Sequence, residues 1–186
     1  MSDPFHLRAP TPGEVGKLAE LGRTTFVETF GDRYHPDDLR AFLDEQYREE
    51  LIAAELADPD FRHRIIEHQG ELIAIIKTGP LHLPVPDPPP GAMEIRQLYV
   101  RQNFLSRGLG KTLTAWALES FEASRIPKIY LSVFSENERA IRFYQNHGFK
   151  KCGEYQYPVG RHLDLEWIMS LKSQDLKQAT SKRTSG

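Results

Sequence analysis

The chain has 186 residues, of which 39% are hydrophobic and 27% are charged, and its formal net charge is −2. This length and composition suit one globular domain with a substantial core. The near-neutral charge gives no basic surplus that would favour a nucleic-acid partner and no acidic surplus typical of a solvating tail. A single cysteine, Cys152, excludes a disulfide framework and fits a reducing compartment.

No segment has the pattern of a targeting or membrane-spanning sequence. The N-terminal MSDPFHLRAP lacks the apolar core of a signal peptide, and no apolar run approaches the ~18 residues of a membrane span. We therefore expect a cytoplasmic protein without a membrane partner. The final segment, SQDLKQATSKRTSG (173–186), has no hydrophobic periodicity, which predicts a disordered tail behind a domain of residues 1–172.

The first part of the chain predicts a strand followed by helices. Residues 5–9 alternate in polarity, as a strand does. Thr11 and Glu14 have the spacing of a helix-capping box, and apolar residues then recur at helical spacing as far as Gly31. Residues 35–60 predict one or two further amphipathic helices.

A β-hairpin and a stiff loop come next. Two β-rich runs, 61–68 and 71–79, flank the short turn Gln69–Gly70, which predicts an antiparallel pair of strands. The segment PLHLPVPDPPPGA (80–92) contains too many prolines for a helix or a central strand, so it predicts an exposed loop.

The second half of the chain alternates strands and helices. In chain order these are a strand at 93–100, a helix at 108–124, a strand at 128–134, a helix at 136–148 and strands at 150–157 and 162–172. Together with the first half, this order predicts a single α/β (α+β) domain in which about four helices flank a mixed sheet of about seven strands.

The segment SRGLGKTL (106–113) is similar to a phosphate-binding loop. A triphosphate-binding P-loop needs a glycine five positions before its Gly-Lys pair, where this chain has Leu105. A dinucleotide-binding turn needs a third glycine, where this chain has Leu113. Both nucleotide-binding interpretations are therefore disfavoured.

Gly108 and Gly110 are the informative residues of this loop. A strand ends at Val100, and the two glycines let backbone amides at a helix N-terminus face an anion such as a pyrophosphate. Lys111 adds a point charge nearby. A glycine-rich helix start without a ligand is the alternative interpretation.

Two motifs resemble those of the GNAT family of N-acetyltransferases. One is the loop LSRGLG (105–110), in which Leu105 stands where the family has Gln or Arg. The other is SVFSENERAIRFYQNHGF (132–149), which matches the family in order and spacing at Asn137, Ala140, Ile141, Phe143, Tyr144, Gly148 and Phe149. The resemblance covers residues 5–171, and within the family the chain is similar to the PaiA-type polyamine N-acetyltransferases.

This resemblance implies a fold and a cosubstrate. The family has a mostly antiparallel sheet whose central strands, here 93–100 and 128–134, splay apart to admit acetyl-CoA. Loop amides bind its pyrophosphate, and the first splayed strand and an asparagine bind its pantetheine arm. The residues so implied are Leu98, Tyr99, Val100, Leu105, Ser106, Arg107, Gly108, Leu109, Gly110, Lys111, Asn137 and Tyr144. No histidines or other ligands have metal-site spacing, so we expect no metal.

The resemblance also implies catalytic residues. Tyr144 would donate a proton to the leaving CoA thiolate. Glu94, at the start of its strand, would be the general base, with a solvated strand-end charge as the alternative. Arg96, on the same face of the strand, would either lower the pKa of Glu94 or replace a second candidate base. A backbone amide of Tyr99 or Val100 would polarise the thioester oxygen.

A cationic acceptor would need carboxylates and aromatic faces. Candidates cluster around the predicted junction of the first two helices, which borders the acceptor site in this family: Glu28, Asp32, Tyr34, Asp37 and Asp38. A charged, capped helix turn is the alternative interpretation of that cluster. Asp164 and Glu166 alternate on the last strand, which predicts that both face the mouth of the cleft.

The sequence thus predicts an acetyl-CoA-dependent N-acetyltransferase. We expect the acceptor to be a primary amine of a small cation, polyamine or diamine favoured, which attacks directly in a ternary complex. Acetylation of a peptide N-terminus or a lysine is one alternative, and an acyl-CoA-binding sensor without activity is another. We expect a monomer or a homodimer and no nucleic-acid partner.

Overall fold

A computed structural model describes residues 4–175. The predicted tail at 173–186 lies outside the described residues, except for a helical turn at 173–175. The helices are α1 (Val15–Phe30), α2 (Pro36–Gln46), α3 (Glu49–Ala57), α4 (Leu109–Ala123) and α5 (Glu138–Asn146), with short 3₁₀ turns η1 (Pro12–Glu14), η2 (Gly31–Arg33) and η3 (Gln102–Phe104). None of the described helices has the length and hydropathy needed to cross a membrane.

Seven strands form one sheet in the order β1-β2-β3-β4-β5-β7-β6. They are β1 (His6–Arg8), β2 (Arg62–His68), β3 (Glu71–Pro80), β4 (Met93–Val100), β5 (Lys128–Phe134), β6 (Lys150–Val159) and β7 (His162–Lys172). All neighbouring strands are antiparallel except β4 and β5, which run parallel. This confirms the predicted mixed, mostly antiparallel sheet.

The turn between β2 and β3 has the backbone that its sequence predicts. Gln69 and Gly70 have φ values of +53° and +80°, the positive values that a two-residue type I′ turn requires. Such a turn matches the right-handed twist of the flanking strands, and it pairs His68 with Glu71. The predicted hairpin is therefore confirmed.

The segment 35–60 forms two helices, so that residues 4–175 contain five α-helices where the sequence predicts about four. The break falls at Tyr47 and Arg48, where Arg48 adopts an extended backbone (φ −70°, ψ 140°). The ring of Tyr47 is buried against Gly22 of α1, where an added Cβ would lie only 2.5 Å from the ring. The glycine thus makes room for a tyrosine that ends α2.

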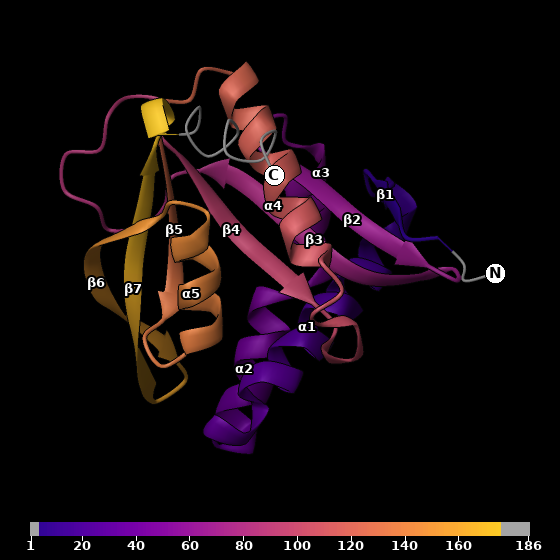
Figure 1. Cartoon of the computed structure of the whole chain (residues 1–186). Coiled ribbons are helices and arrows are strands. Elements are labelled where there is room, and N and C mark those ends of the chain that lie inside the picture. The colour runs from indigo at the N-terminus through magenta and orange to yellow at the C-terminus, as the bar shows by residue number, and fades with distance from the viewer. Residues whose placement is uncertain (1–3, 176–186) are drawn as a thin grey trace.

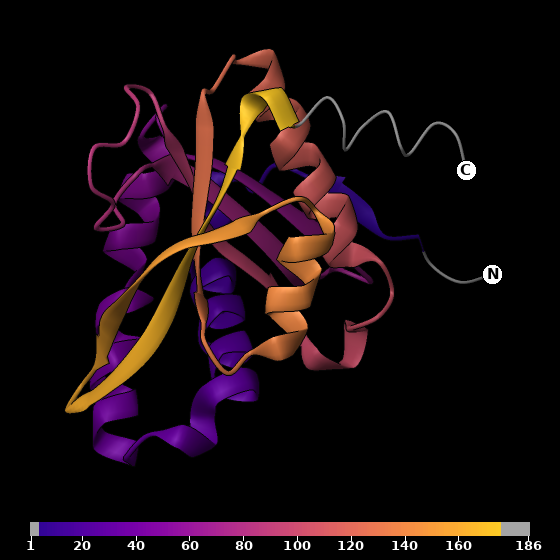
Figure 2. The same cartoon turned by 60° about the vertical axis from the view of Figure 1, so that its left-hand side comes forward.

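The helices cover both faces of the sheet. α4 and α5 lie in front of the sheet in Figure 1 and pack on a cluster that includes Leu131, Val133 and Tyr144. α1, α2 and α3 pack on the opposite face around two smaller clusters. Figure 2 shows the β6–β7 hairpin reaching down to α2, where Arg161 Nε lies 3.0 Å from Asp38 Oδ2.

The two central strands diverge, and this shapes the site. Within the described residues β4 pairs with β5 only at Met93 and Glu94. Beyond that point the strands separate in Figure 1, while β4 stays paired with β3 as far as Val100 and β5 stays paired with β7 as far as Phe134. The predicted splayed pair is therefore confirmed. We call the opening between β4 and β5 the slot.

Candidate active site

The slot has two chemically different sides. Side chains on β5 alternate, so Leu131 and Val133 face α4 and α5 whereas Ser132 and Phe134 face α1 and α2. The ring of Phe134 contacts Phe30 at the end of α1, with 6.1 Å between ring centroids. Groups from α5 and groups from the α1–α2 side therefore lie on opposite faces of the sheet, which is open between β4 and β5.

The loop that the sequence predicts to bind an anion lies on the α4–α5 side, at the start of α4. Ser106 and Gly108 have φ values of +63° and +82°, so the loop turns through left-handed conformations before the helix begins. Ser106, Arg107 and Gly108 are exposed, and an added Cβ on Gly108 would meet nothing within 4 Å. Successive amides in such a turn, at a helix N-terminus, form an anion-binding concavity with open space before it.

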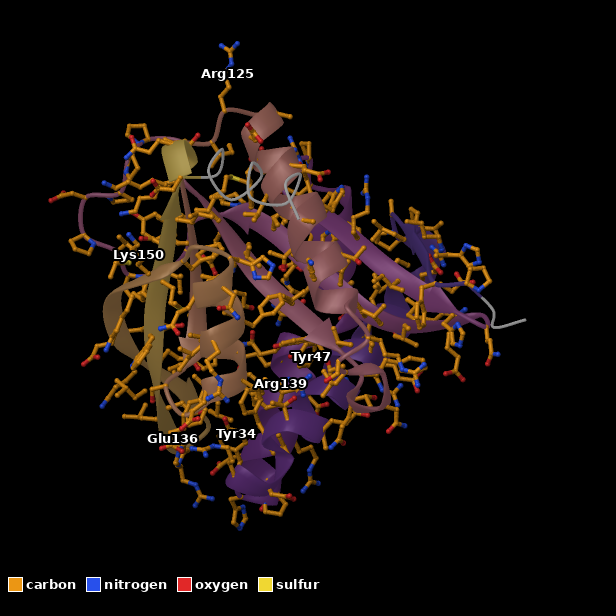
Figure 3. All side chains as sticks on the ribbon, viewed as in Figure 1. Tyr34, Tyr47, Arg125, Glu136, Arg139 and Lys150 are labelled. Carbon is orange, nitrogen blue, oxygen red and sulfur yellow. The ribbon has the colours of Figure 1, made fainter. Side chains whose placement is uncertain are left out.

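Two cations lie beside this loop. Lys111 is exposed in the first turn of α4. Arg139 of α5 reaches across, with its Nη2 3.4 Å from Ser106 Oγ, and Figure 3 labels it. The sequence prediction does not include Arg139, because nothing in its local pattern distinguishes it from a solvated helix charge.

α5 positions the predicted asparagine and tyrosine together. Asn137 is the N-cap, and its Oδ1 accepts the amide N–H of Ala140 at 3.1 Å. Tyr144 lies seven residues later, which is about two helical turns, so both side chains project from one side of the helix. The asparagine therefore fixes where α5 starts and thereby where Tyr144 points.

Tyr144 is buried and remains protonated at neutral pH. Its ring packs edge-on against Phe143 and Phe149, with centroid distances of 5.3 and 5.9 Å. Burial raises the pKa of its phenol well above the ordinary value, and the nearby Tyr99 and Glu166 raise it further. A protonated phenol in this position can donate a hydrogen bond or a proton, but it is a poor base.

Phenols line the α1–α2 side of the slot. The hydroxyls of Tyr47 and Tyr99 are 3.2 Å apart. Tyr155 and Tyr157 project from β6, and the Tyr155 hydroxyl lies 3.4 Å from Ser132 Oγ. Figure 3 labels Tyr47, together with Tyr34 from the α1–α2 connection, in the lower part of the molecule below the end of β4.

A carboxylate, Glu166, lies among these phenols. β7 pairs Glu166 with Phe134 on one side and with Tyr155 on the other, so all three share the face that looks toward α1 and α2. Desolvation, and then the charge of Asp164, raise the pKa of Glu166 to about 7, against a smaller opposing effect of Ser132. This carboxylate therefore keeps its proton to a higher pH than an ordinary glutamate does.

Asp164 is buried at the edge of the same face. It accepts a hydrogen bond from the Tyr34 hydroxyl, and Arg33 Nη2 and His162 Nε2 lie 3.7 and 3.1 Å from its Oδ1. Tyr34 thus satisfies Oδ2, whereas Oδ1 is buried and forms no hydrogen bond within the described residues. The prediction that Asp164 and Glu166 share one face is consistent with this geometry.

Comparison with known protein families identifies the family to which this sequence belongs. Residues 23–149 match the profile of the Acetyltransferase (GNAT) family, which covers more than half of the chain. The protein belongs to the GNAT acetyltransferase family. The matched residues include the two splayed strands, the loop before α4 and the helix from Asn137 to Tyr144.

Several known proteins are similar to this acetyltransferase in sequence, and others are similar to it in structure. An uncharacterized N-acetyltransferase of Lactobacillus delbrueckii subsp. lactis is 28% identical over 84% of the chain and 90% of its own length. The spermine/spermidine N(1)-acetyltransferase of Bacillus subtilis is 28% identical over 48% of the chain and 60% of its own length. The PaiA N-acetyltransferase of Thermoplasma acidophilum, solved with coenzyme A, superposes with a TM-score of 0.73 at 20% identity, over 91% of this chain and 99% of that one.

Glu94 of the acetyltransferase is tied to the proline-rich loop. Its Oε2 accepts the backbone N–H of His82 at 2.8 Å and that of Leu83 at 3.3 Å. Burial raises the pKa of the Glu94 carboxyl, although these two amides and Arg96 act in the opposite direction. The effect of Arg96 thus has the predicted sign but does not dominate. Glu94 therefore fastens the loop to the sheet where β4 and β5 begin to separate.

The three predicted acceptor residues of the acetyltransferase occupy different settings. Glu28 pairs with Arg101 Nε at 3.1 Å and accepts the amide of Gln102 at 2.8 Å, which holds the loop after β4. Asp32 is exposed in η2. Tyr34 is the one that contacts a carboxylate of the slot, because it donates to Asp164.

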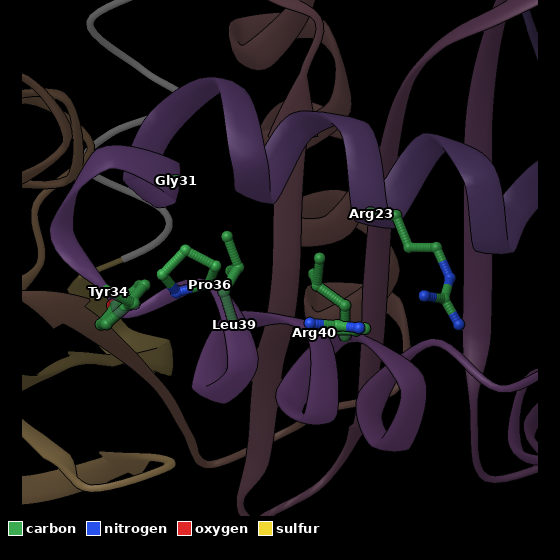
Figure 4. Close-up of a pocket in the computed structure, with 7 residues that line it drawn as sticks. Arg23, Gly31, Tyr34, Pro36, Leu39 and Arg40 are labelled. Atoms are coloured by element: carbon green, nitrogen blue, oxygen red, sulfur yellow. The ribbon is translucent and has the colours of Figure 1, made fainter.

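A hollow of about 240 Å³ opens between α1 and α2, beside Tyr34 (Figure 4). Arg23 and Arg40 stand on its rim, paired with Asp44 and Asp37 at 2.8 and 2.5 Å. Because each guanidinium is balanced by a carboxylate, the charges on the rim do not select between a cation and an anion.

Proposed function

We propose that this GNAT enzyme transfers the acetyl group of acetyl-CoA to a primary amine of a small cation, with a polyamine or a diamine as the favoured acceptor. The observation that carries the proposal is the slot itself. A protonated phenol, Tyr144, lies on the α4–α5 face of the sheet beside it, and a carboxylate, Glu166, lies on the α1–α2 face, where phenols gather. The similarity to the spermine/spermidine N(1)-acetyltransferase of Bacillus subtilis supports the choice of acceptor.

The residues of the α4–α5 side fit acetyl-CoA, which supplies an activated thioester when bound. The amides from Leu105 to Gly110 fit a pyrophosphate, and Lys111 and Arg139 add positive charge beside it. Leu98, Tyr99 and Val100 leave one backbone edge toward the slot, where peptide-like amides of the pantetheine arm can pair. Asn137 keeps its amide N–H groups as donors, because its oxygen caps α5.

The chain's own groups then perform the transfer. A backbone amide of Tyr99 or Val100 polarises the thioester carbonyl and stabilises negative charge as it develops on the oxygen. The amine attacks directly while both substrates are bound, which makes positioning a large part of the catalysis. The Tyr144 hydroxyl donates its proton to the departing sulfur. Glu94 stays a prediction for the general base.

A panel of amines tests the acceptor. We expect 1,4-diaminobutane and spermidine to be acetylated with a kcat/KM about 10-fold above that of butylamine, because a second ammonium can contact phenol faces in the slot. The measurement is the release of free CoA thiol at fixed acetyl-CoA. Equal values for butylamine and the diamine would contradict a dicationic acceptor. Thiol release with peptides alone would favour a peptide N-acetyltransferase, and CoA binding without any release would favour the sensor.

The conformation of Gly108 tests the cosubstrate loop. We expect Gly108→Ala to raise the KM for acetyl-CoA roughly 3- to 10-fold, because a side chain at φ +82° costs about 1–2 kcal/mol and shifts the loop amides. Gly13→Ala is the matched control, since an added Cβ also meets nothing within 4 Å there and its φ is not positive. The KM of each variant is obtained from initial rates at a series of acetyl-CoA concentrations. Equal KM values in the two would remove the loop from acetyl-CoA binding.

A further inference from the structure

Glu166 and Tyr144 approach the slot from opposite faces of the sheet. Tyr144 belongs to the cluster that packs α4 and α5 on the sheet. Glu166 shares its face with Phe134 and Tyr155, which look toward α1 and α2. The charge of Glu166 raises the pKa of phenols that line the slot, and Tyr144 is among them. The two groups therefore lie on opposite faces of the sheet and are near enough to interact electrostatically.

We propose that Glu166 is the general base of this acetyltransferase: it binds the reacting ammonium on the phenol-lined side of the slot and takes up its proton. The inference rests on the proposed function, and it assigns to Glu166 the role that the sequence gives to Glu94. Tyr144, on the other side of the slot, remains the acid.

The hydrogen-bonding of the two carboxylates favours Glu166 over Glu94. Two backbone amides of the proline-rich loop, those of His82 and Leu83, already bind Glu94 Oε2, and they orient that carboxylate toward the loop. Glu94 also stands where β4 and β5 are still paired, at Tyr130, and so at the closed end of the slot. Glu166 lies beside Phe134, the last residue of β5, where the strands have separated.

The groups that interact with Glu166 suit a base that works near neutral pH. They are Asp164 from β7, Ser132 from β5, Tyr155 and Tyr157 from β6, Tyr99 from β4, Tyr144 from α5 and Tyr34 from the α1–α2 connection. Arg33 acts on Asp164 and Tyr34 at the edge of this group. The phenols are neutral, and the neighbouring carboxylate favours protonation of Glu166. An ammonium that binds here supplies the missing positive charge and the proton.

The proton balance of the step is complete. Glu166 takes one proton from the ammonium, and the freed nitrogen forms the C–N bond to the acetyl carbon. The C–S bond breaks, and Tyr144 gives its hydroxyl proton to the sulfur. The nitrogen then loses its second proton, Tyr144 regains one, and Glu166 releases its own to solvent. The products are the N-acetyl amine, free CoA and one proton.

The test compares Glu166→Gln with Glu94→Gln and with Glu154→Gln, an exposed glutamate on β6 that pairs with Lys151. For wild type we expect kcat/KM for 1,4-diaminobutane to fall 10-fold for each pH unit below about pH 7, because a single carboxylate must be deprotonated. Glu166→Gln should lower kcat/KM at pH 8 by roughly 100-fold or more and remove this acidic limb. Glu154→Gln should retain both the rate and the limb.

A second readout does not depend on turnover. We expect calorimetric binding of the diamine to the CoA-bound enzyme at pH 8 to be about 10-fold weaker in Glu166→Gln, because the charge that binds the ammonium is lost. An acidic limb that persists in Glu166→Gln, or that disappears in Glu94→Gln instead, would overturn the assignment while leaving the acetyltransferase proposal intact. Wild-type enzyme that acetylates no amine would overturn both.

Discussion

Tyr144→Phe is expected to lower kcat at least ~10-fold while acetyl-CoA affinity stays within about twofold. The substitution removes only the hydroxyl, since phenylalanine keeps the ring that packs between Phe143 and Phe149. The raised pKa keeps that hydroxyl protonated, so it is ready to protonate a thiolate throughout the neutral range. Steady-state rates and CoA binding, measured on the same preparation, separate the loss of a proton donor from the loss of a binding contact.

The matched control for Tyr144 is another buried phenol. Tyr130 on β5 is 1% exposed and interacts with Lys128, whose Nζ lies 4.8 Å from the ring centroid. Tyr130→Phe should leave kcat within about twofold, because its hydroxyl is not part of the proposed transfer. If both substitutions lower kcat equally, the effect of Tyr144→Phe reflects altered packing. If neither does, the acid is a different group or a water molecule.

The sequence predicts those parts of the fold that local signals determine. The boundaries of β4 and β5 agree with the predicted strands at 93–100 and 128–134, because each run is rich in β-branched and aromatic residues and is bounded by turns. The break at Tyr47 does not follow from local signals, since it depends on a tertiary contact with Gly22. A single-sequence pattern contains no information about which distant residue leaves space for a ring.

Residues of the site that belong to one sequence motif can be predicted from the sequence. Residues whose role depends on contacts between distant parts of the chain are harder to predict. The resemblance to the family motif singles out Asn137 and Tyr144, and their spacing of seven residues places both on one side of a helix. Glu28 is the kind of residue that an acceptor site would need. Its carboxylate, however, accepts a hydrogen bond from Arg101, which lies far along the chain. The last hairpin contains a further signal, because a two-residue turn between β6 and β7 pairs the strands so that Tyr155 opposes Glu166. That register, which follows from the length of the turn, places a phenol beside the carboxylate.

The proposed mechanism divides the proton transfers between two of the groups whose pKa values burial raises, Tyr144 and Glu166. The acid must keep its proton until the sulfur departs, and burial of Tyr144 among aromatic rings has that effect. The base must be able to lose its proton near neutral pH. Burial and the charge of Asp164 raise the pKa of Glu166 to about 7, and a group with this pKa both accepts and releases a proton in that range. The sheet keeps the two apart, so a proton passes between them only by way of the substrates.

Glu166→Gln is also expected to stabilise the folded protein, by roughly 1–3 kcal/mol at pH 8. The folded state raises the pKa of Glu166 from 4.5 to about 7, so folding favours the protonated form. The contribution of Glu166 to stability is therefore fully present below about pH 4.5 and is lost as the pH rises through 7. Glutamine stays neutral, so the variant and wild type should have similar stability at pH 4.5 and diverge up to about pH 7.

Denaturant unfolding at a series of pH values measures this difference, with Glu154→Gln as the exposed control that should follow wild type. A constant offset between Glu166→Gln and wild type at every pH would mean that the carboxylate does not titrate between 4.5 and 7. A destabilised variant at pH 8 would mean that Glu166 forms a favourable charged contact in the fold. We expect Glu166→Gln to be more stable than wild type and less active. This combination indicates that the charge of Glu166 lowers the stability of the fold and is needed for the reaction.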